Sequence, residues 1–283
     1  MTRIIDSLDE IAGDYDALFC DLWGCYHNGV RPYAAAVAAL RAFRARGGAV
    51  VLMTNAPRAN RFVLRHLDRM GAPADSWDAV VSSGDAALAE IGAGRWGRRL
   101  EYVGPPHDLS FFDGLDVELV GTPDADSVVC VGLEDDSRET PDDYAGRIAG
   151  WAARGLPMLC ANPDIVVDRG HERLWCAGAI AEAYRAAGGA VTYPGKPHPP
   201  IYALGRRLLA DMGRAAPRIL AVGDGIATDV LGGAQAGIDT LFVTGGLAAE
   251  AVSDDPERPD ADRLARFLAD APARPTYAIG RLR

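Results

Sequence analysis

The sequence has few cysteines, and their spacing fits neither a disulfide framework nor a zinc site. Five are present, at positions 20, 25, 130, 160 and 176, and they form no Cys-x-x-Cys pair. An odd number without paired spacing argues against a disulfide-stapled scaffold. We interpret them as small buried hydrophobic residues in a reducing environment, which predicts a cytoplasmic protein.

Long hydrophobic runs and an excess of positive charge are also missing. Arginine, aspartate or glycine interrupts each apolar stretch well before the ~20 residues that a membrane span requires. The first ten residues are too acidic for a secretory signal peptide. A net charge of −10 argues against nucleic acid or an anionic membrane as a partner. A phosphorylated metabolite is still allowed, because a site can be locally positive inside an acidic protein.

What the sequence does contain is a regular alternation of apolar runs and helical patterns. Apolar runs without polar alternation, such as residues 17–20, are typical of strands buried on both faces. The expected strands are 17–20, 49–53, 78–82, 219–223 and 240–243, and the expected helices are 33–46, 57–70, 85–91 and 199–212. This spacing indicates right-handed βαβ units. The predicted fold class is α/β, with a Rossmann-like, doubly wound parallel sheet as the core.

The pattern changes after a linker-like run at residues 92–97, and 283 residues are enough for two domains. Further short strands follow, and Thr140-Pro141 begins a helix with an N-cap residue and a proline in its first turn. We therefore predict a core of residues 1–89 plus 178–283, with a smaller inserted α/β cap domain of residues 90–177. The helix at 179–187 is expected to return to the core.

Polar residues follow several of the expected strands of the core. Asp21 ends the first buried run, and in open α/β sheets ligands bind at that edge. Three later segments have the same character: Thr54-Asn55, Gly195-Lys196-Pro197, and the segment that begins at Gly223-Asp224 and ends at Asp229. We interpret these four segments as parts of one active site.

The residue types in these segments suit phosphate and magnesium. Two carboxylates as close as Asp224 and Asp229 would repel each other unless a cation lay between them, and oxygen ligands suit Mg²⁺. Taken singly, each residue has an ordinary alternative. Asp229 can be the acid of a helix N-terminus, Thr54 can be structural, and Lys196 can be solvated. It is the combination with Asp21 that favours the functional interpretation.

The four segments resemble the motifs of the haloacid dehalogenase superfamily. Their order is Asp-x-x-Gly, Thr-Asn, a large insertion, Gly-Lys-Pro, and Gly-Asp with a second Asp five residues later. A cap between the second and third motifs is similar to class IIA, which includes p-nitrophenyl phosphatases and nucleotide phosphatases. The sequences around Asn162-Pro163-Asp164 and at residues 229–240 also resemble sequences of that class. The resemblance covers residues 16–246.

The resemblance implies a Mg²⁺-dependent phosphatase that forms an aspartyl-phosphate on a small phosphorylated metabolite. Asp21 would be the nucleophile, Thr54 would hold the transferring oxygens, and Lys196 would offset their charge. The implied metal ligands are Asp21, the backbone carbonyl of Trp23, Asp224, and Asp229 in or near the first shell.

The same resemblance extends to substrate contacts and partners. Asn55 joins Thr54 and Lys196 as an implied phosphate contact, and Asn162 and Asp164 are candidate substrate residues of the cap, although an Asn-Pro-Asp turn can equally be a structural hinge. The cap would close over the substrate and exclude water. Related capped enzymes often dimerise through the cap, so a homodimer is an expected partner.

One position departs from the family pattern. Phosphatases of the family carry a second Asp two residues after the nucleophile as general acid and base, and here that residue is Trp23. Positioned proton transfer is worth ~10²–10⁴-fold, so we expect slow turnover. His27, six residues after Asp21, is a candidate substitute because its pKa range suits proton transfer. A surface position or a hydrogen bond to the backbone is the alternative for His27.

Two other functions fit the same residues. A non-catalytic binder or sensor of a phosphorylated ligand would explain Trp23. A carbon–halogen hydrolase would need no general acid, but the Asp224/Asp229 pair and Lys196 favour phosphate and magnesium over that reaction.

Overall fold

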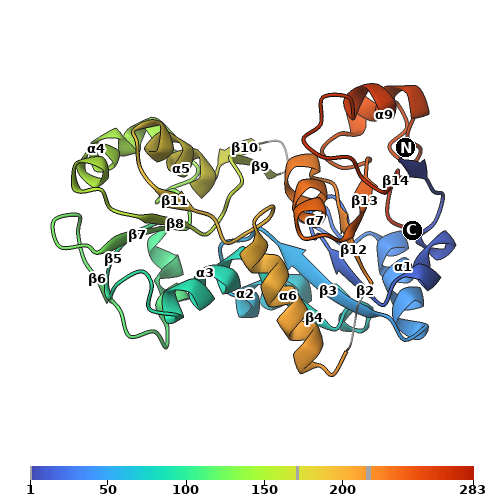
Figure 1. The fold of residues 1–283 in the computed structure, drawn as a ribbon, viewed down its shortest axis with the longest axis horizontal. Helices are drawn as coiled ribbons and strands as arrows, with labels where there is room; N and C mark the ends of the chain where they lie inside the picture. Colours follow the sequence, from blue (N-terminus) through green and yellow to red (C-terminus); the bar gives the residue numbers. More distant parts are fainter. Residues whose placement is uncertain (1, 170–171, 215–217) are drawn as a thin grey trace. The chain divides into compact units, whose positions relative to one another are not determined.

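The computed structural model describes residues 2–169, 172–214 and 218–283, and it divides into two compact units. The first comprises the described residues of Met1–Thr54, Leu64–Val81 and Lys196–Arg283. The second comprises Asn55–Val63 and Ser82–Gly195. Each unit has its own parallel sheet with helices around it (Figure 1), which confirms the predicted α/β class.

The sheet of the first unit has seven strands in the order β1-β14-β13-β12-β2-β3-β4. Their bounds are β1 (Arg3–Ile4), β2 (Ala17–Cys20), β3 (Ala49–Thr54), β4 (Ala79–Ser82), β12 (Ile219–Gly223), β13 (Asp239–Val243) and β14 (Tyr277–Ile279). From β2 the chain proceeds outward through β3 to β4, and from β12 it proceeds the other way through β13 to β14. The sheet is therefore doubly wound, and its switch point lies between β2 and β12.

Apolar sequence explains the centre of this sheet. Every residue of β2, β3 and β12 is buried, as unalternating hydrophobic runs predict. Helices α1 (Ala34–Ala45) and α6 (Pro199–Asp211) pack against β3, and α6 passes in front of it in Figure 1. Helix α1 ends at Ala45, close to the end expected at residue 46, and Gly47 follows it with a left-handed φ of +90°.

Shorter helices complete the first unit, and one helix belongs to both. Helix α2 (Asn60–Arg69) begins in the second unit and ends in the first. The remaining helical segments of the first unit are α7 (Leu231–Gln235), α8 (Ala249–Val252), α9 (Ala261–Phe267), a π-turn at Ile226–Val230, and 3₁₀ turns at Leu8–Glu10, Ala12–Asp14 and Ala74–Ser76.

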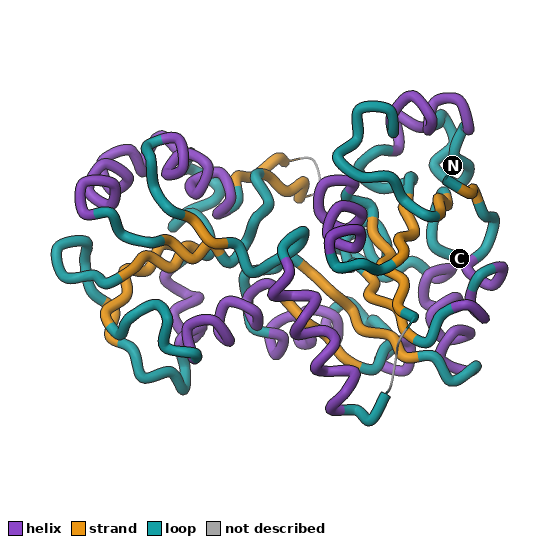
Figure 2. Tube along the Cα trace, in the orientation of Figure 1, coloured by secondary structure: helices purple, strands orange, loops and turns teal. Residues whose placement is uncertain are grey.

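The second unit has a five-stranded parallel sheet in the order β11-β8-β7-β5-β6 and an antiparallel pair, β9 and β10. Its strands are β5 (Arg99–Val103), β6 (Glu118–Leu119), β7 (Ser127–Cys130), β8 (Met158–Cys160), β9 (Val166–Arg169), β10 (Glu172–Trp175) and β11 (Val191–Thr192). Its helices are α3 (Ser83–Gly92), α4 (Ala145–Arg154) and α5 (Ala177–Ala186), with 3₁₀ turns at Pro106–Phe112 and Pro141–Tyr144. Figure 2 shows these helices around the strands. The helical segment expected to begin at Thr140-Pro141 is present, and Thr140 and Asp143 form a capping box at its start, ahead of α4.

The second unit extends beyond the predicted cap of 90–177. Helix α3 buries Ala87 and Ile91 in one cluster with Trp96 and Leu100 of the second unit. The prediction that the helix at 179–187 returns to the core is wrong, because α5 buries residues such as Tyr184 in the core of the second unit. The apolar face of a helix shows that it packs on a sheet, but it does not show on which sheet.

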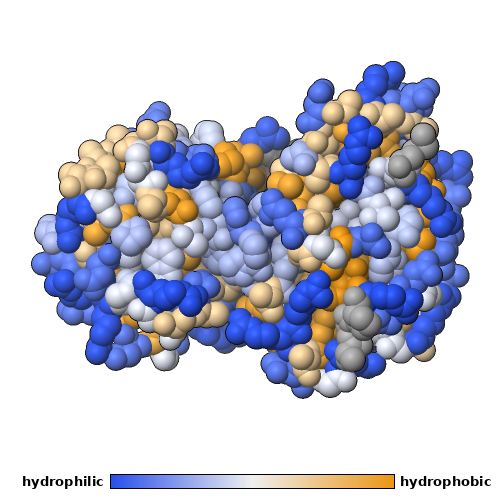
Figure 3. All heavy atoms as spheres, viewed as in Figure 1, coloured by the Kyte–Doolittle hydropathy of each residue, from blue (hydrophilic) through white to orange (hydrophobic). Residues whose placement is uncertain are grey.

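Hydrophilic residues lie between small groups of hydrophobic ones on the face drawn in Figure 3. Among the described residues, the helices are all too short or too polar to cross a membrane.

Candidate active site

Two buried carboxylates lie at the switch point of the first sheet. Asp21 follows β2 and Asp224 follows β12, and these strands are direct neighbours in parallel register, with Cys20 opposite Val222. One carboxylate oxygen of Asp21, one of Asp224 and the Sγ of Cys25 all lie within 4.8 Å of one another. The structure thus brings the two predicted carboxylates together, at a separation that allows a shared ion.

Two glycines let the backbone approach Asp224. Gly24 has a φ of +71°, and a Cβ built on it would overlap Asp224 Oδ2. A Cβ on Gly246 would overlap the same oxygen, and the N–H of Leu247 donates to it at 3.0 Å. The Asp-x-x-Gly motif pointed to Gly24, but Gly246 and Leu247 lie far along the sequence, and no pattern there signalled their part.

Lys196 lies between two carboxylates and is 3% exposed. Its Nζ donates to Asp21 Oδ1 at 2.6 Å and to Asp229 Oδ1 at 2.7 Å. The predicted lysine therefore contacts the predicted nucleophile directly.

Asp229 is fixed by the π-turn that follows Gly225. Its N–H and that of Val230 both donate to the carbonyl of Gly225, and Asp229 Oδ2 accepts the Gly225 N–H at 3.1 Å. A Cβ on Gly223 would overlap the Asp229 carboxylate. With one oxygen on Lys196 and the other on Gly225, Asp229 orients the lysine. The close group around Asp21 and Asp224 contains Cys25, not Asp229, so a metal-ligand role for Asp229 stays a prediction.

Electrostatics at the site favour a cation. Burial raises the pKa of Asp21 well above its usual range, and the attraction of Lys196 opposes this shift. Burial and then the Asp229 carboxylate raise the pKa of Asp224 to about 7. Burial alone would lower the pKa of Lys196, but Asp21 and Asp229 outweigh it and hold that pKa well above normal. Three carboxylates with one ammonium carry excess negative charge, so the donor set fits a hard divalent ion.

Cys25 is the residue of this group that sequence reasoning did not assign to the site. It is 1% exposed, as the reading of cysteines as buried hydrophobes predicted, and all five cysteines are free and buried. Its Sγ nevertheless faces the two carboxylates. Burial raises the pKa of the Cys25 thiol well above its usual range, with Asp224 adding to the effect.

The loop after β2 holds Trp23 and His27 in edge-to-face contact. Their ring centroids are 5.2 Å apart, the Trp23 residue is 38% exposed, and a Cβ on Gly29 would overlap the indole. The proposed metal contact of the Trp23 carbonyl stays a prediction. His27 is buried, and its Nδ1 accepts the Gly29 N–H at 3.0 Å. Burial, and then the nearby His66, lower the pKa of His27 to about 4, which makes it a weak base at neutral pH.

The other predicted contacts fall in two places. Thr54 is buried at the end of β3, beside β2 in the first unit. Asn55, Asn162 and Asp164 lie together in the second unit, where Asn55 Nδ2 donates to Asp164 Oδ1 at 2.9 Å. Asn162 Oδ1 accepts the Asp164 N–H at 3.1 Å. This bond closes the Asn-Pro-Asp turn, so it supports the structural alternative for Asn162.

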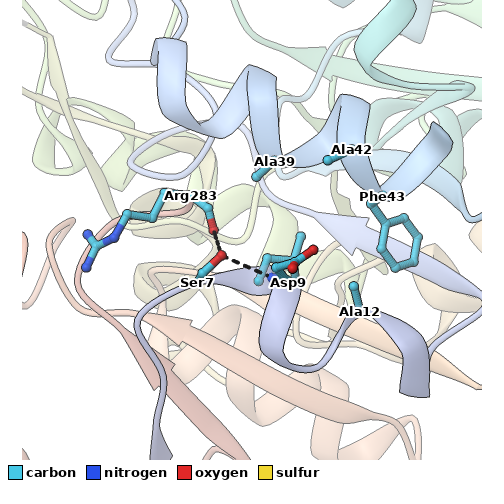
Figure 4. A pocket seen from close by; sticks show the side chains of 8 residues that line it. Ser7, Asp9, Ala12, Ala39, Ala42, Phe43 and Arg283 are labelled. Carbon is cyan, nitrogen blue, oxygen red and sulfur yellow. Dashed lines mark hydrogen bonds between the residues drawn. The ribbon is translucent and has the colours of Figure 1, made fainter. Parts of the chain in front are cut away.

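A small cavity elsewhere in the first unit is not part of this site. It has a volume of about 60 Å³ and lies between the 3₁₀ turns near the N-terminus and the end of α1 (Figure 4). Ser7 Oγ donates to the main-chain oxygen of Arg283 there, and it accepts the Asp9 N–H. None of the predicted site residues lines the cavity, and it has room only for a few water molecules.

Two family models match two separate parts of the chain. Residues 18–118 match a haloacid dehalogenase-like hydrolase model, and residues 193–271 match a second model described as HAD-hydrolase-like. The ribonucleotide monophosphatase NagD of Escherichia coli K12 is 28% identical over 252 residues, which are 86% of this chain and 93% of NagD.

Solved structures of similar proteins extend the comparison to the fold. The crystal structure of a haloacid dehalogenase-like family hydrolase from Brucella suis 1330 has a TM-score of 0.85 and 40% identity, covering 99% of this chain and 100% of that one. Glycerol phosphate phosphatase from Mycobacterium tuberculosis, in complex with magnesium, has a TM-score of 0.67 and 28% identity, covering 88% of this chain and 75% of that one. Another structure of that phosphatase is in complex with calcium.

Proposed function

Because the chain belongs to the haloacid dehalogenase-like hydrolase family, we propose that it is a slow, Mg²⁺-dependent phosphatase of small phosphorylated metabolites, with Asp21 as its nucleophile. The observation that carries the proposal is the contact of the buried Lys196 ammonium with Asp21, beside Asp224. This arrangement offers a nucleophile, a fixed positive charge and a place for a divalent ion at one edge of the sheet.

The reaction needs two displacements at phosphorus. In the first, a carboxylate oxygen of Asp21 attacks phosphorus and the leaving oxygen departs with its electron pair, which gives an aspartyl-phosphate. In the second, water attacks the same phosphorus, the Asp21 carboxylate departs, and the water proton passes to solvent. Lys196 offsets charge on the phosphoryl oxygens, and Asp229 keeps its ammonium in place.

Asp21 and Asp224 would hold the Mg²⁺, and Thr54 would contact the phosphoryl oxygens. When bound, the ion would neutralise the negative charge that develops on those oxygens.

Trp23 makes the second displacement the slower one. Its indole N–H can only donate a hydrogen bond, so it cannot accept a proton from the attacking water. His27 has a pKa of about 4 and uses Nδ1 to accept the Gly29 N–H, which leaves it poorly suited to replace the missing base. A penalty of ~10²–10⁴-fold is typical for loss of positioned proton transfer.

Relatives and chain organisation support the finer parts of the proposal. The names of NagD and of the mycobacterial enzyme both describe phosphatases of small phosphate esters. We propose that the second unit acts as the class IIA cap and that copies of the chain pair through it. Five free thiols are compatible with the cytoplasmic location that we propose.

A substrate screen tests the proposal. Phosphorylated metabolites are incubated with the full chain, with and without Mg²⁺, and both phosphate release and thermal shift are measured. We expect release that requires Mg²⁺ and disappears in Asp21→Asn, because an amide is no nucleophile. A thermal shift without release in the wild type would instead support the non-catalytic binder, which Trp23 favours as the second candidate.

A further inference from the structure

We propose that Cys25 makes this centre a site for thiophilic divalent cations such as Zn²⁺, Co²⁺ and Cd²⁺, which bind its sulfur together with Asp21 and Asp224. The inference rests on the proposed role of that carboxylate pair in holding Mg²⁺. It adds a second class of ion to the site and predicts competition between the two classes.

The geometry of the three ligand atoms carries the inference. Cys25 Sγ lies within 4.8 Å of an oxygen of each carboxylate, and all three residues are buried. Zn²⁺ binds sulfur at about 2.3 Å and carboxylate oxygen at about 2.0–2.2 Å, so tetrahedral coordination places a sulfur and an oxygen ligand about 3.6 Å apart. That separation lies within the 4.8 Å limit that contains the three ligand atoms.

The Cys25 thiol also makes no competing hydrogen bond to a described residue. Among the residues that the structure describes, its thiol has no hydrogen-bond partner, although its residue is 1% exposed. The neighbouring Cys20 thiol, by contrast, donates to the main-chain oxygen of Asp21 at 3.3 Å. The Cys25 sulfur is therefore buried, makes no hydrogen bond within the described part of the chain and faces two carboxylates, so it is available to bind a metal ion.

The turn after β2 fixes this placement. The N–H groups of Tyr26 and His27 both donate to the carbonyl of Leu22, at 2.9 Å each, and the Gly24 N–H donates to the carbonyl of His27 at 3.0 Å. The turn carries Gly24 so close to Asp224 that no side chain fits between them. Cys25 is therefore held over the carboxylates by backbone bonds, and its position does not depend on a flexible loop.

Ion chemistry decides which cation uses the sulfur. Mg²⁺ takes oxygen ligands and would leave Cys25 as a bystander. Soft thiolate ligands select thiophilic ions, and Zn²⁺ and Co²⁺ exceed Mg²⁺ as partners for such a mixed site. When the sulfur–metal bond forms, the thiol proton leaves to solvent. The same carboxylates cannot hold both ions, so Zn²⁺ should displace Mg²⁺.

Cobalt absorbance tests the inference directly. The full chain is stripped of metal with a chelator and titrated with Co²⁺. We expect a thiolate-to-cobalt charge-transfer band in the near ultraviolet for the wild type, and the same band for the control Cys176→Ser. The band should vanish in Cys25→Ser and in Cys25→Ala.

Calorimetric titration supplies the affinities. The loss of Zn²⁺ affinity in Cys25→Ser should be at least the ~10–100-fold that removal of a supporting group around a metal typically causes. Added Zn²⁺ should release bound Mg²⁺ from the wild type in competition titrations.

A wild type without the charge-transfer band, or equal Zn²⁺ affinity in wild type and Cys25→Ser, would overturn the inference. Circular dichroism reports whether each variant folds, and if Cys25→Ser does not fold, Cys25→Ala supplies the comparison. Because these readouts are absorbance and binding, they are independent of turnover. A clear band in a protein that releases no phosphate would refute the phosphatase and leave the thiophilic site standing.

Discussion

At the scale of single residues, Lys196 dominates the electrostatics of the site. It is the only lysine of the chain, whereas every other basic side chain apart from histidine is arginine. An ammonium is a compact point charge that fits between two carboxylates, while a guanidinium is a planar fork of larger extent. The contacts to Asp21 and Asp229, both shorter than 2.8 Å, use that compactness.

Lys196→Met should therefore destabilise the fold and abolish phosphate release. Removing one partner of a buried ionic group typically costs about 3–5 kcal/mol, because the other charges stay buried without compensation. Urea unfolding measures the loss of unfolding free energy, and a phosphate assay measures the activity. Lys196→Arg is the matched control for charge, and we expect it to stay inactive. Full activity in the arginine variant would show that charge alone matters at this position.

His27 should give the fold a characteristic sensitivity to acid. Its pKa in the folded state is about 4, below the unperturbed 6.5, because burial opposes the charged form. Between these values the unfolded chain binds a proton that the folded chain does not. The unfolding free energy should thus fall as pH falls from about 6.5 to 4, by up to about 3 kcal/mol.

Comparison of variants isolates this contribution. His27→Asn keeps an acceptor for the Gly29 N–H and cannot titrate, so its unfolding free energy should depend less on pH in that window. The exposed His107 provides the control, and His107→Asn should behave as the wild type does. Identical pH profiles for all three proteins in chemical denaturation would contradict the buried, neutral imidazole.

At the scale of elements, glycines place the acidic loops against one another. Of the glycines around Asp224, Gly246 is the best to test, because it has no left-handed φ and the three atoms nearest to a Cβ built on it all belong to the Asp224 side chain. Gly246→Ala should push Asp224 aside and weaken Mg²⁺ binding. Strain of this kind is typically worth about 1–3 kcal/mol, or roughly 5- to 150-fold in affinity.

Gly13→Ala is the matched control for that substitution. A Cβ at Gly13 meets no atom within 4 Å, and its φ is not left-handed. Calorimetric Mg²⁺ titrations of both variants should show a change only for Gly246→Ala. Equal affinity in the two would mean that Asp224 does not hold the ion.

The elements also show what a sequence can reveal. Strands β2, β3, β12 and β13 were predictable because buried parallel strands are apolar without interruption. The edge strand β1 and the β9–β10 pair were not, because β1 has only two, exposed residues and β10 alternates too briefly to differ from a loop. The π-turn that aims Asp229 at Lys196 left no periodic signal, although the Asp-x-x-x-x-Asp spacing identified both acids.

Within the site, all four charged residues that lie in contact were predicted. Asp21 and Asp224 could be found because polar residues after buried parallel strands converge at one sheet edge, whereas Asp229 and Lys196 were identified by the motifs Gly-Asp-x-x-x-x-Asp and Gly-Lys-Pro. Cys25 and Gly246 could not, because a cysteine in an apolar run and a glycine in a loop have common structural explanations. The composition also points to Lys196, because it is the only lysine of the chain, but the Gly-Lys-Pro motif had already identified it.

At the scale of the whole molecule, the chain forms two cores from interleaved segments. The second unit begins earlier and ends later than its composition suggested, since α3 and α5 contribute to its core. The composition of a loop shows where the sequence pattern changes, but the core in which the helices bury their side chains determines where a unit ends. The four charged residues of the predicted site nevertheless all lie in the first unit. They are Asp21, Lys196, Asp224 and Asp229.

Asp21 should be phosphorylated rapidly and dephosphorylated slowly, because Trp23 stands where a proton shuttle would act. Stopped-flow release of p-nitrophenol from p-nitrophenyl phosphate, with Mg²⁺, tests it most directly. We expect a burst stoichiometric with enzyme, followed by a slow steady rate. Trp23→Asp should raise that steady rate by part of the ~10²–10⁴-fold factor, and His27→Ala should leave it unchanged. Release without a burst, at a rate that neither Asp21→Asn nor Trp23→Asp changes, would contradict it.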